Sequence, residues 1–185
     1  KFYVNDRYLT LHTHKPFMGK RIGFVVYNNQ KIAITNFNVK YINQKNNVTK
    51  PIIVAKGENI LTEYFTDNSN NWPTGSNTEK NTNVSNSFYN FEHKLNKSGW
   101  AVNIPKTIDT SRDFEIKANI KKVSGVTNYS YGLQWGKEGN NSFRFYLTAN
   151  GYYKIARVVN NKEEIIKKFT TSTAIKKGNG VTNTF

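Results

Sequence analysis

Five short runs with β-forming composition follow one another between Arg112 and Phe169, and breaks that contain Gly or Asn separate them. The runs read RDFEIKANIKK, YSYGLQWG, SFRFYLT, YYKIARVV and KEEIIKKF. Two of the breaks are Asn150-Gly151 and Asn160-Asn161, and both residue types tolerate the positive φ angle that a tight hairpin turn requires. Strands joined by such short turns run antiparallel. The sequence therefore predicts an all-β fold of antiparallel strands.

Length and composition limit the classes of protein to which the chain can belong. With 185 residues, 37% of them hydrophobic, it can bury one sizeable core, and a single antiparallel β-sandwich can use all of it. No run approaches the roughly 20 apolar residues of a membrane-spanning helix, so we expect no membrane span. The absence of cysteine excludes disulfides and thiolate chemistry. It leaves the compartment open, and an extracellular or cell-surface location on a bacterium is compatible with it.

A formal net charge of +15 raises the question of a nucleic-acid partner. Only five of the 27 basic residues are arginine, and the other 22, all lysine, are scattered singly along the chain. They accompany a high content of Asn and Ile, and a coding bias toward AT-rich codons produces this combination without selection for a polyanion. We therefore do not expect a nucleic-acid partner.

The predicted strands fall into two blocks around an irregular stretch. Residues 1–42 contain a turn at Asn5-Asp6, a turn at Asn28-Asn29 and four candidate strands. Residues 43–61 include Pro51 and Gly57 and show no clear period, which indicates a linker. Residues 62–185 open with a strand, continue through a long polar loop and resume as strands from Phe88 onward. We expect no helix, and we expect the chain to be an excerpt of a longer protein with other domains.

Three strings in the second block, DFEIKANIKKVSG, YGLQWGKEGNNSFRFYLTANGYYKIARV and TSTAIKKGNGVTN, resemble the concanavalin A-like lectin/glucanase jelly rolls of bacterial multidomain proteins. The first block, with KFYVNDRYL and GKRIGFVVYNNQKIAITNFNVKYI, resembles the closing strands of the same jelly roll. Here the closing strands come first. The chain therefore either spans the junction of two tandem domains or is a circular permutant whose blocks close one sandwich.

Glycosidases of the resembled fold carry paired carboxylates on one strand, so acidic residues were considered for catalysis. The nearest pattern is Asp113-Phe114-Glu115, but the next alternate position is Lys117, which breaks the constellation. Glu163 and Glu164 are adjacent, so on a strand they point to opposite faces. We interpret all four acids as solvated strand charges and predict no catalytic residue.

Metal ligands are sparse. His12 and His14 share one face of a strand, but His93 is remote in sequence, so we expect no zinc site. The loop from Asp67 to Asn71 offers oxygen ligands, and calcium binding is common in the resembled family. Because this loop lacks the spaced acids of a high-affinity calcium loop, we interpret it as an Asn-rich turn and expect no cofactor, with calcium as the open alternative.

Alternation divides the central strands into two faces. The predicted core face consists of Tyr129, Tyr131, Leu133, Trp135, Phe143, Phe145 and Leu147. The opposite face consists of Gln134, Arg144 and Tyr146, joined by Tyr152 and Lys154 from the next strand. Aromatic surface flanked by amide and cationic donors suits a sugar, which offers an apolar C–H face and a ring of hydroxyls. These five residues are therefore the predicted ligand-binding residues.

The function that follows is a noncatalytic, lectin-like binding module that recognises carbohydrate, or a partner protein surface, on its concave sheet. Two alternatives stay open. The first is a glycoside-processing enzyme like the 3-keto-disaccharide hydrolase-like jelly rolls, since missing paired acids do not exclude every hydrolase. The second is a structural spacer between other domains.

Overall fold

The computed structural model describes residues 1–13, 19–42 and 57–185, and within them every regular element is a β-strand. The strands are β1 (Phe2–Val4), β2 (Arg7–Thr10), β3 (Arg21–Tyr27), β4 (Gln30–Tyr41), β5 (Asn59–Glu63), β6 (Gly75–Ser76), β7 (Lys80–Ser85), β8 (Phe88–His93), β9 (Gly99–Thr107), β10 (Phe114–Gly125), β11 (Ser130–Glu138), β12 (Asn141–Thr148), β13 (Tyr152–Val159), β14 (Lys162–Thr171) and β15 (Thr182–Thr184). The all-β prediction is confirmed. Nothing in the described part of the chain forms a helix long and apolar enough to cross a membrane.

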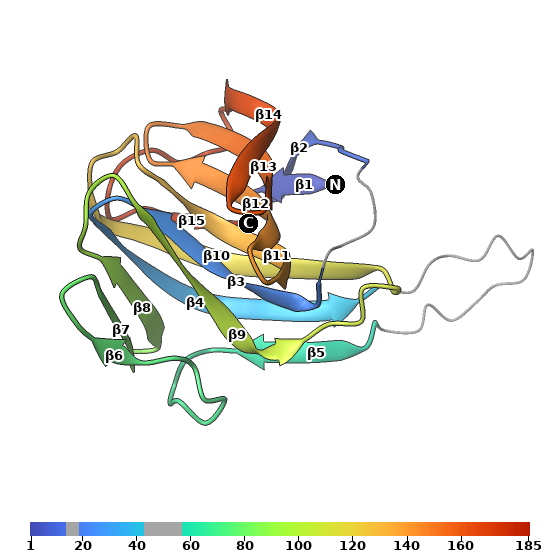
Figure 1. Ribbon diagram of the computed structural model, residues 1–185, viewed down its shortest axis with the longest axis horizontal. Coiled ribbons are helices and arrows are strands. Elements are labelled where there is room, and N and C mark those ends of the chain that lie inside the picture. The colour runs from blue at the N-terminus through green and yellow to red at the C-terminus, as the bar shows by residue number, and fades with distance from the viewer. Residues whose placement is uncertain (14–18, 43–56) are drawn as a thin grey trace, which may run out of the picture.

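The strands form two antiparallel sheets that pack as a sandwich (Figure 1), and β1 and β2 form a separate hairpin. Six strands of the seven-stranded sheet have the order β15-β10-β4-β8-β7-β6. The seventh, β5, pairs with the second half of β4, whereas β8 pairs with its first half. The six-stranded sheet has the order β14-β13-β12-β11-β3-β9. An antiparallel β-sandwich of this kind is compatible with a jelly roll.

The block before residue 43 supplies interior strands to both sheets. Strand β3 lies between β11 and β9 in the six-stranded sheet, and β4 lies between β10 and β8 in the seven-stranded sheet. Within the range 43–61 that we expected to be a linker, residues 43–56 lie outside the described residues, and Asn59 already begins β5. Residues of the two blocks therefore share one core.

Asparagine makes most of the tight turns, as the sequence predicted. Asn5-Asp6 and Asn160-Asn161 have positive φ at both positions, which is the backbone of a type I′ turn, and Asn28 has φ 60°. The predicted polar loop before Phe88 was wrong in part, because it contains β6, β7 and a further turn with positive φ at Asn86-Ser87. These two strands are short and polar, as strands at a sheet edge often are, so their hydrophobic alternation is weak.

The core lies between the two sheets and is strongly aromatic. Six of the seven predicted core residues are buried there. Tyr129 is the exception, because it precedes β11 and is only half-buried. Trp72 is buried among four aromatic rings, while Trp100 packs at the margin of the core.

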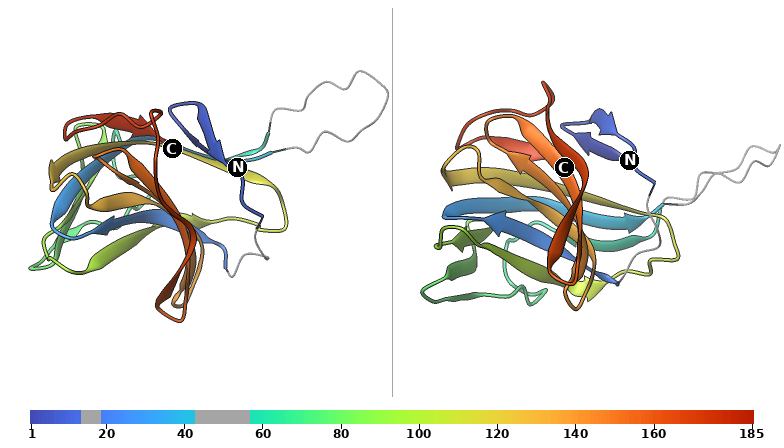
Figure 2. Two further views of the ribbon diagram at one scale, coloured as in Figure 1. Left: turned by 90° about the horizontal axis from the view of Figure 1, so that it is seen from above. Right: turned by 45° about the horizontal axis from the view of Figure 1, so that its top comes forward.

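The six-stranded sheet bends away from its partner at one end. In the left view of Figure 2, the turn end of β12, β13 and β14 hangs away from the seven-stranded sheet. The pairing of β11 with both neighbours shifts register after Gln134 and Trp135, where Gly136 has φ 60°. Such bulges bend a strand and increase its twist. The face of this sheet turned away from the core is here called the outer face.

Candidate functional site

Small residues form the floor of the outer face. Gly23, Val25, Ala101, Gly132 and Ala156 occupy neighbouring outward positions on β3, β9, β11 and β13. A Cβ atom added to Gly132 would lie 2.0 Å from the carbonyl oxygen of Phe145, so no larger residue fits there without a backbone shift. Large side chains from neighbouring positions can therefore lie flat on this floor.

Two tyrosines and an arginine lie on this floor and bond to one another. The hydroxyl groups of Tyr27 and Tyr146 are 3.1 Å apart, and the Arg144 guanidinium donates to both of them. Tyr146 is fully buried against Val25 and Ala156. Burial, followed by the neighbouring Tyr27, raises the pKa of Tyr146 above its ordinary value. The Tyr146 hydroxyl therefore stays protonated at neutral pH and can donate as well as accept hydrogen bonds.

An ion pair extends the arrangement to β13 and β14. The Tyr146 hydroxyl donates to Glu163 Oε2 at 2.9 Å, and Lys154 Nζ donates to Glu163 Oε1 at 2.5 Å. The Lys154 ammonium also lies 4.7 Å from the Tyr146 ring centre and 5.0 Å from that of Phe169. We call Tyr27, Arg144, Tyr146, Lys154 and Glu163 the tyrosine–arginine cluster. It joins four strands of the sheet into one hydrogen-bonded group.

Three of the five predicted ligand-binding residues belong to this cluster: Arg144, Tyr146 and Lys154. Tyr152 lies beside it on β13 and is 36% exposed. Gln134 is fully buried, donates to Asn103 Oδ1 at 2.9 Å, and keeps its own Oε1 without a partner among the described residues. Tyr146 and Gln134 therefore support the surface from below, and the exposed aromatic area comes from Tyr152 and Phe169.

Sequence reasoning missed Tyr27, Glu163 and Phe169 as members of this surface. Tyr27 lies 117 positions before Arg144 in the chain, and only the pairing of β3 with β11 brings them together. Phe169 is 47% exposed on β14, where a register shift against β13 changes the faces that simple alternation would assign. Alternation along β14 separates Glu163 from Glu164, but it cannot show that Glu163 lies beside Tyr146, which is two strands away in the sheet.

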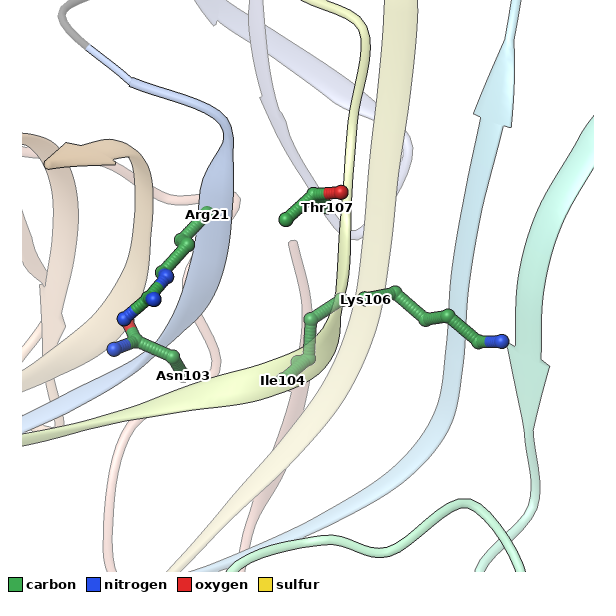
Figure 3. Close-up of a pocket in the computed structure, with 5 residues that line it drawn as sticks. All are labelled: Arg21, Asn103, Ile104, Lys106 and Thr107. Atoms are coloured by element: carbon green, nitrogen blue, oxygen red, sulfur yellow. The ribbon is translucent and has the colours of Figure 1, made fainter.

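A cleft opens at the border of this surface, between β3 and β9. It has a volume of about 260 Å³ and is lined by Arg21, Asn103, Ile104, Lys106 and Thr107. Figure 3 shows the Arg21 side chain extending toward the Asn103 carboxamide, while the Lys106 side chain extends the other way. We call it the β9 cleft. It places a guanidinium group beside the hydrogen bond between the buried Gln134 and the half-buried Asn103.

A larger cavity, of about 790 Å³, lies beside the β1–β2 hairpin. Its apolar lining includes Phe2, Leu133, Trp135, Phe145 and Phe185. Lys117 and Arg112 on its rim are paired with Asp6 at 3.1 Å and Glu58 at 2.7 Å, respectively. These two cations on the rim therefore already have carboxylate partners.

The acids considered for catalysis are dispersed. Glu115 pairs with Lys40 at 2.8 Å on the seven-stranded sheet, whereas Asp113 lines the hairpin cavity. Glu163 belongs to the tyrosine–arginine cluster, and Glu164 pairs with Arg157 at 2.5 Å. Each of these three glutamates is thus held by a lysine or an arginine.

No group of three His, Cys, Asp or Glu side chains comes together in residues 1–13, 19–42 and 57–185. His93 is buried and its ring nitrogens contact Asn28 O and Ser98 Oγ, His12 lines the hairpin cavity, and His14 lies outside the described residues. In the Asn-rich loop, Asp67 Oδ1 accepts a bond from Ser69 N at 2.8 Å, as in a turn. Calcium binding at this loop stays an untested alternative.

Lys122 is an unexpected buried cation. Alternation along β10 places it on the inner face with Ala118 and Ile120, and it is fully buried there. Its Nζ donates to the carbonyl oxygens of Val126 at 2.5 Å and Tyr129 at 3.4 Å, which ties the β10–β11 turn to the sheet. Burial lowers the pKa of Lys122 to about 8.

This pKa predicts a stability that depends on pH. Native Lys122 releases its proton near pH 8, whereas the unfolded chain keeps it until about pH 10.4. Between these values the unfolded state binds more protons, so the free energy of unfolding rises with pH, by at most about 1.4 kcal/mol per pH unit. Urea unfolding from pH 7 to 9.5 should show this rise in the wild type and a clearly smaller one in Lys122→Met, where the lowered pKa of Lys137 still contributes.

The upper limit of that range matters because burial raises the pKa of Tyr89 and Tyr131 to about 12. Unfolded tyrosines ionise near pH 10, so these two residues lower stability above that pH and would mask the lysine. Lys121→Met on the same strand is the matched control and should keep the rise. Parallel curves for wild type and Lys122→Met would contradict the assignment.

Comparison with known proteins does not add to this geometry: no family model matches the chain, and neither the curated proteins nor the solved structures contain a match. The functional argument therefore depends on the fold and on the outer face of the six-stranded sheet.

Proposed function

We propose that the chain is a noncatalytic, lectin-like binding module of the concanavalin A-like jelly-roll type, and that it binds carbohydrate on the outer face of its six-stranded sheet. The observation that carries this proposal is the tyrosine–arginine cluster. Its hydroxyl, guanidinium, ammonium and carboxylate groups come from four strands and hold one another by hydrogen bonds. A prearranged set of donors and acceptors is what recognition of sugar hydroxyls requires, because little side-chain freedom is lost on binding.

Exposed aromatic surface lies next to these polar groups. Tyr152 and Phe169 are 36% and 47% exposed, and the Lys154 ammonium near the Phe169 ring adds a donor at its edge. The C–H face of a pyranose can pack on such rings while its hydroxyls reach the cluster. A binding role also agrees with the dispersed acids, since a retaining glycosidase needs two carboxyl groups about 5 Å apart.

The test is a glycan array followed by calorimetry with the best glycan. We expect the wild type to bind at least one oligosaccharide, and Tyr152→Ala combined with Phe169→Ala to weaken that binding about tenfold or more. Both side chains are exposed, so the melting temperature should change little. Tyr64→Ala is the matched control, because Tyr64 is 59% exposed and lies after β5 of the other sheet.

Two results would contradict the proposal. Silence of the wild type across neutral and acidic glycans would remove carbohydrate binding. Equal loss of affinity in Tyr64→Ala and in the double variant would remove the placement on the outer face. Hydrolysis of a bound glycan would instead show that the module is an enzyme.

A further inference from the structure

Strand β9 makes a wide bulge where it borders the outer face. Arg21 pairs with Thr107 and Gly23 pairs with Asn103, so one residue on β3 lies opposite residues 104–106 on β9. Pro105 lies inside this bulge and has no N–H to donate to a ladder. The extra residues open the β9 cleft of about 260 Å³ (Figure 3). The cleft is therefore built into the strand pairing.

Positive charge collects between this cleft and the tyrosine–arginine cluster. Arg21 on β3 and Lys137 on β11 are directly opposite each other. Arg144 on β12 lies opposite Gln134, which is three residues before Lys137 on β11. Like charges opposite each other in a sheet are unfavourable. Burial, and then the charges of Arg144 and Arg21, lower the pKa of Lys137. In the described ranges, no carboxylate forms an ion pair with Arg21, Lys137 or Arg144.

Five other cations of the described residues form ion pairs. Lys40, Arg112, Lys117, Lys154 and Arg157 each pair with a carboxylate at 2.5–3.1 Å. Only a few acids are available, since the chain has 12 Asp and Glu against 27 Lys and Arg. Arg21 lines the β9 cleft, and Lys137 lies opposite it on β11, so an anion from outside can supply the negative charge that the described carboxylates do not.

We infer that Arg21, Lys137 and Arg144 form an anion subsite, and that the carbohydrate bound on the outer face is an acidic saccharide whose carboxylate or sulfate group enters the β9 cleft. This inference rests on the proposed function and names its ligand class. A guanidinium group presents N–H donors in a planar fork that matches the two oxygens of a carboxylate or of a sulfate. Asn103 and the buried Gln134 below it add polar groups at the same border.

The experiment compares an oligogalacturonate with the same oligosaccharide after reduction of its carboxyl groups to alcohols. Calorimetry at 0.15 M salt should show that the wild type prefers the acidic form by about tenfold or more. Arg21→Gln combined with Lys137→Gln should remove this preference and leave the affinity for the neutral form within about twofold. A sulfated oligosaccharide, tested in parallel, distinguishes sulfate from carboxylate as the favoured anion.

The control must carry the same loss of charge, because a chain with net charge +15 attracts polyanions nonspecifically. Lys121→Gln combined with Lys176→Gln meets this need: Lys121 lies on β10 of the other sheet, and Lys176 is exposed in the segment between β14 and β15. This variant should keep the preference for the acidic form.

The outcomes separate the two proposals. Binding of both forms without preference would overturn the anion subsite and leave carbohydrate binding intact. Binding of neither form, together with silence on the glycan array, would overturn both. Equal loss of preference in the control variant, or tighter binding of a single-stranded DNA of the same charge that also depends on Arg21 and Lys137, would show that the cluster is not a saccharide subsite.

Discussion

Replacing Trp72 with alanine should lower the free energy of unfolding more than any other single substitution considered for this protein. Trp72 is 2% exposed, and its ring centre lies 5.0 Å from those of both Phe65 and Tyr89. Emptying such a site costs about 3–5 kcal/mol. The indole N–H also donates to Glu63 Oε2 at 2.9 Å, and Glu63 is buried. Leaving that carboxylate oxygen with one bond fewer adds about 1–3 kcal/mol.

The expected total approaches the whole stability of an ordinary domain, which is about 5–15 kcal/mol. Urea and thermal unfolding would measure it. Trp72→Phe keeps an aromatic ring and removes the N–H, so it should lose only part of this amount and report the contribution of the bond to Glu63. Trp100→Ala is the matched control, since Trp100 is only partly buried. An effect of Trp72→Ala no larger than that of Trp100→Ala would contradict the packing described above.

Replacing Tyr146 with alanine should cause the second largest loss of free energy of unfolding, and this residue also supports the proposed binding surface. Tyr146 is fully buried on the outer face, and its hydroxyl contacts Tyr27, Arg144 and Glu163. Loss of the ring should lower the free energy of unfolding by about 3–5 kcal/mol. Tyr146→Phe keeps the ring and removes only the hydroxyl, so it should cost about 1 kcal/mol.

This pair of variants separates folding from recognition. If the cluster organises the binding surface, Tyr146→Phe should weaken glycan binding while its unfolding curve stays close to that of the wild type. Tyr152→Ala, at a more exposed position of the neighbouring strand, should change the free energy of unfolding by less than about 0.5 kcal/mol. A Tyr146→Ala protein as stable as Tyr152→Ala would show that the ring is not buried in solution.

Several features of the fold could be predicted because they depend on residues close together in the chain. The two-residue period of SFRFYLT and YYKIARVV identifies strands and their inner faces, and Asn160-Asn161 identifies the turn by its tolerance of positive φ. The same reasoning failed for β6 and β7 because KNTNVS has almost no apolar alternation. It also gave no sign that Lys122 would be an inner residue with a shifted pKa, although the alternation of β10 contained that information.

The candidate site was predictable only in part. The sequence placed Arg144 and Tyr146 on one face of a strand, with Lys154 on the next strand, because hairpin pairing is local. It could not indicate that Tyr146 would be buried and Phe169 exposed, since exposure on an outer face depends on which side chains cover it. Nor could it place Tyr27 or Arg21 beside β11, because that pairing joins segments more than a hundred residues apart.

The sequence by itself determined that this chain forms antiparallel strands, where many of its turns lie, and which side chains of the central strands face the core. These properties follow from backbone sterics and from the alternation of side chains along a strand. The tertiary structure decided that β3 and β4 enter the middle of the two sheets, that a bulge in β9 opens a cleft, and that Arg21 of this cleft lies opposite Lys137, neither of them in an ion pair among the described residues. Such long-range pairings are selected by the burial of the whole core, which no local pattern records.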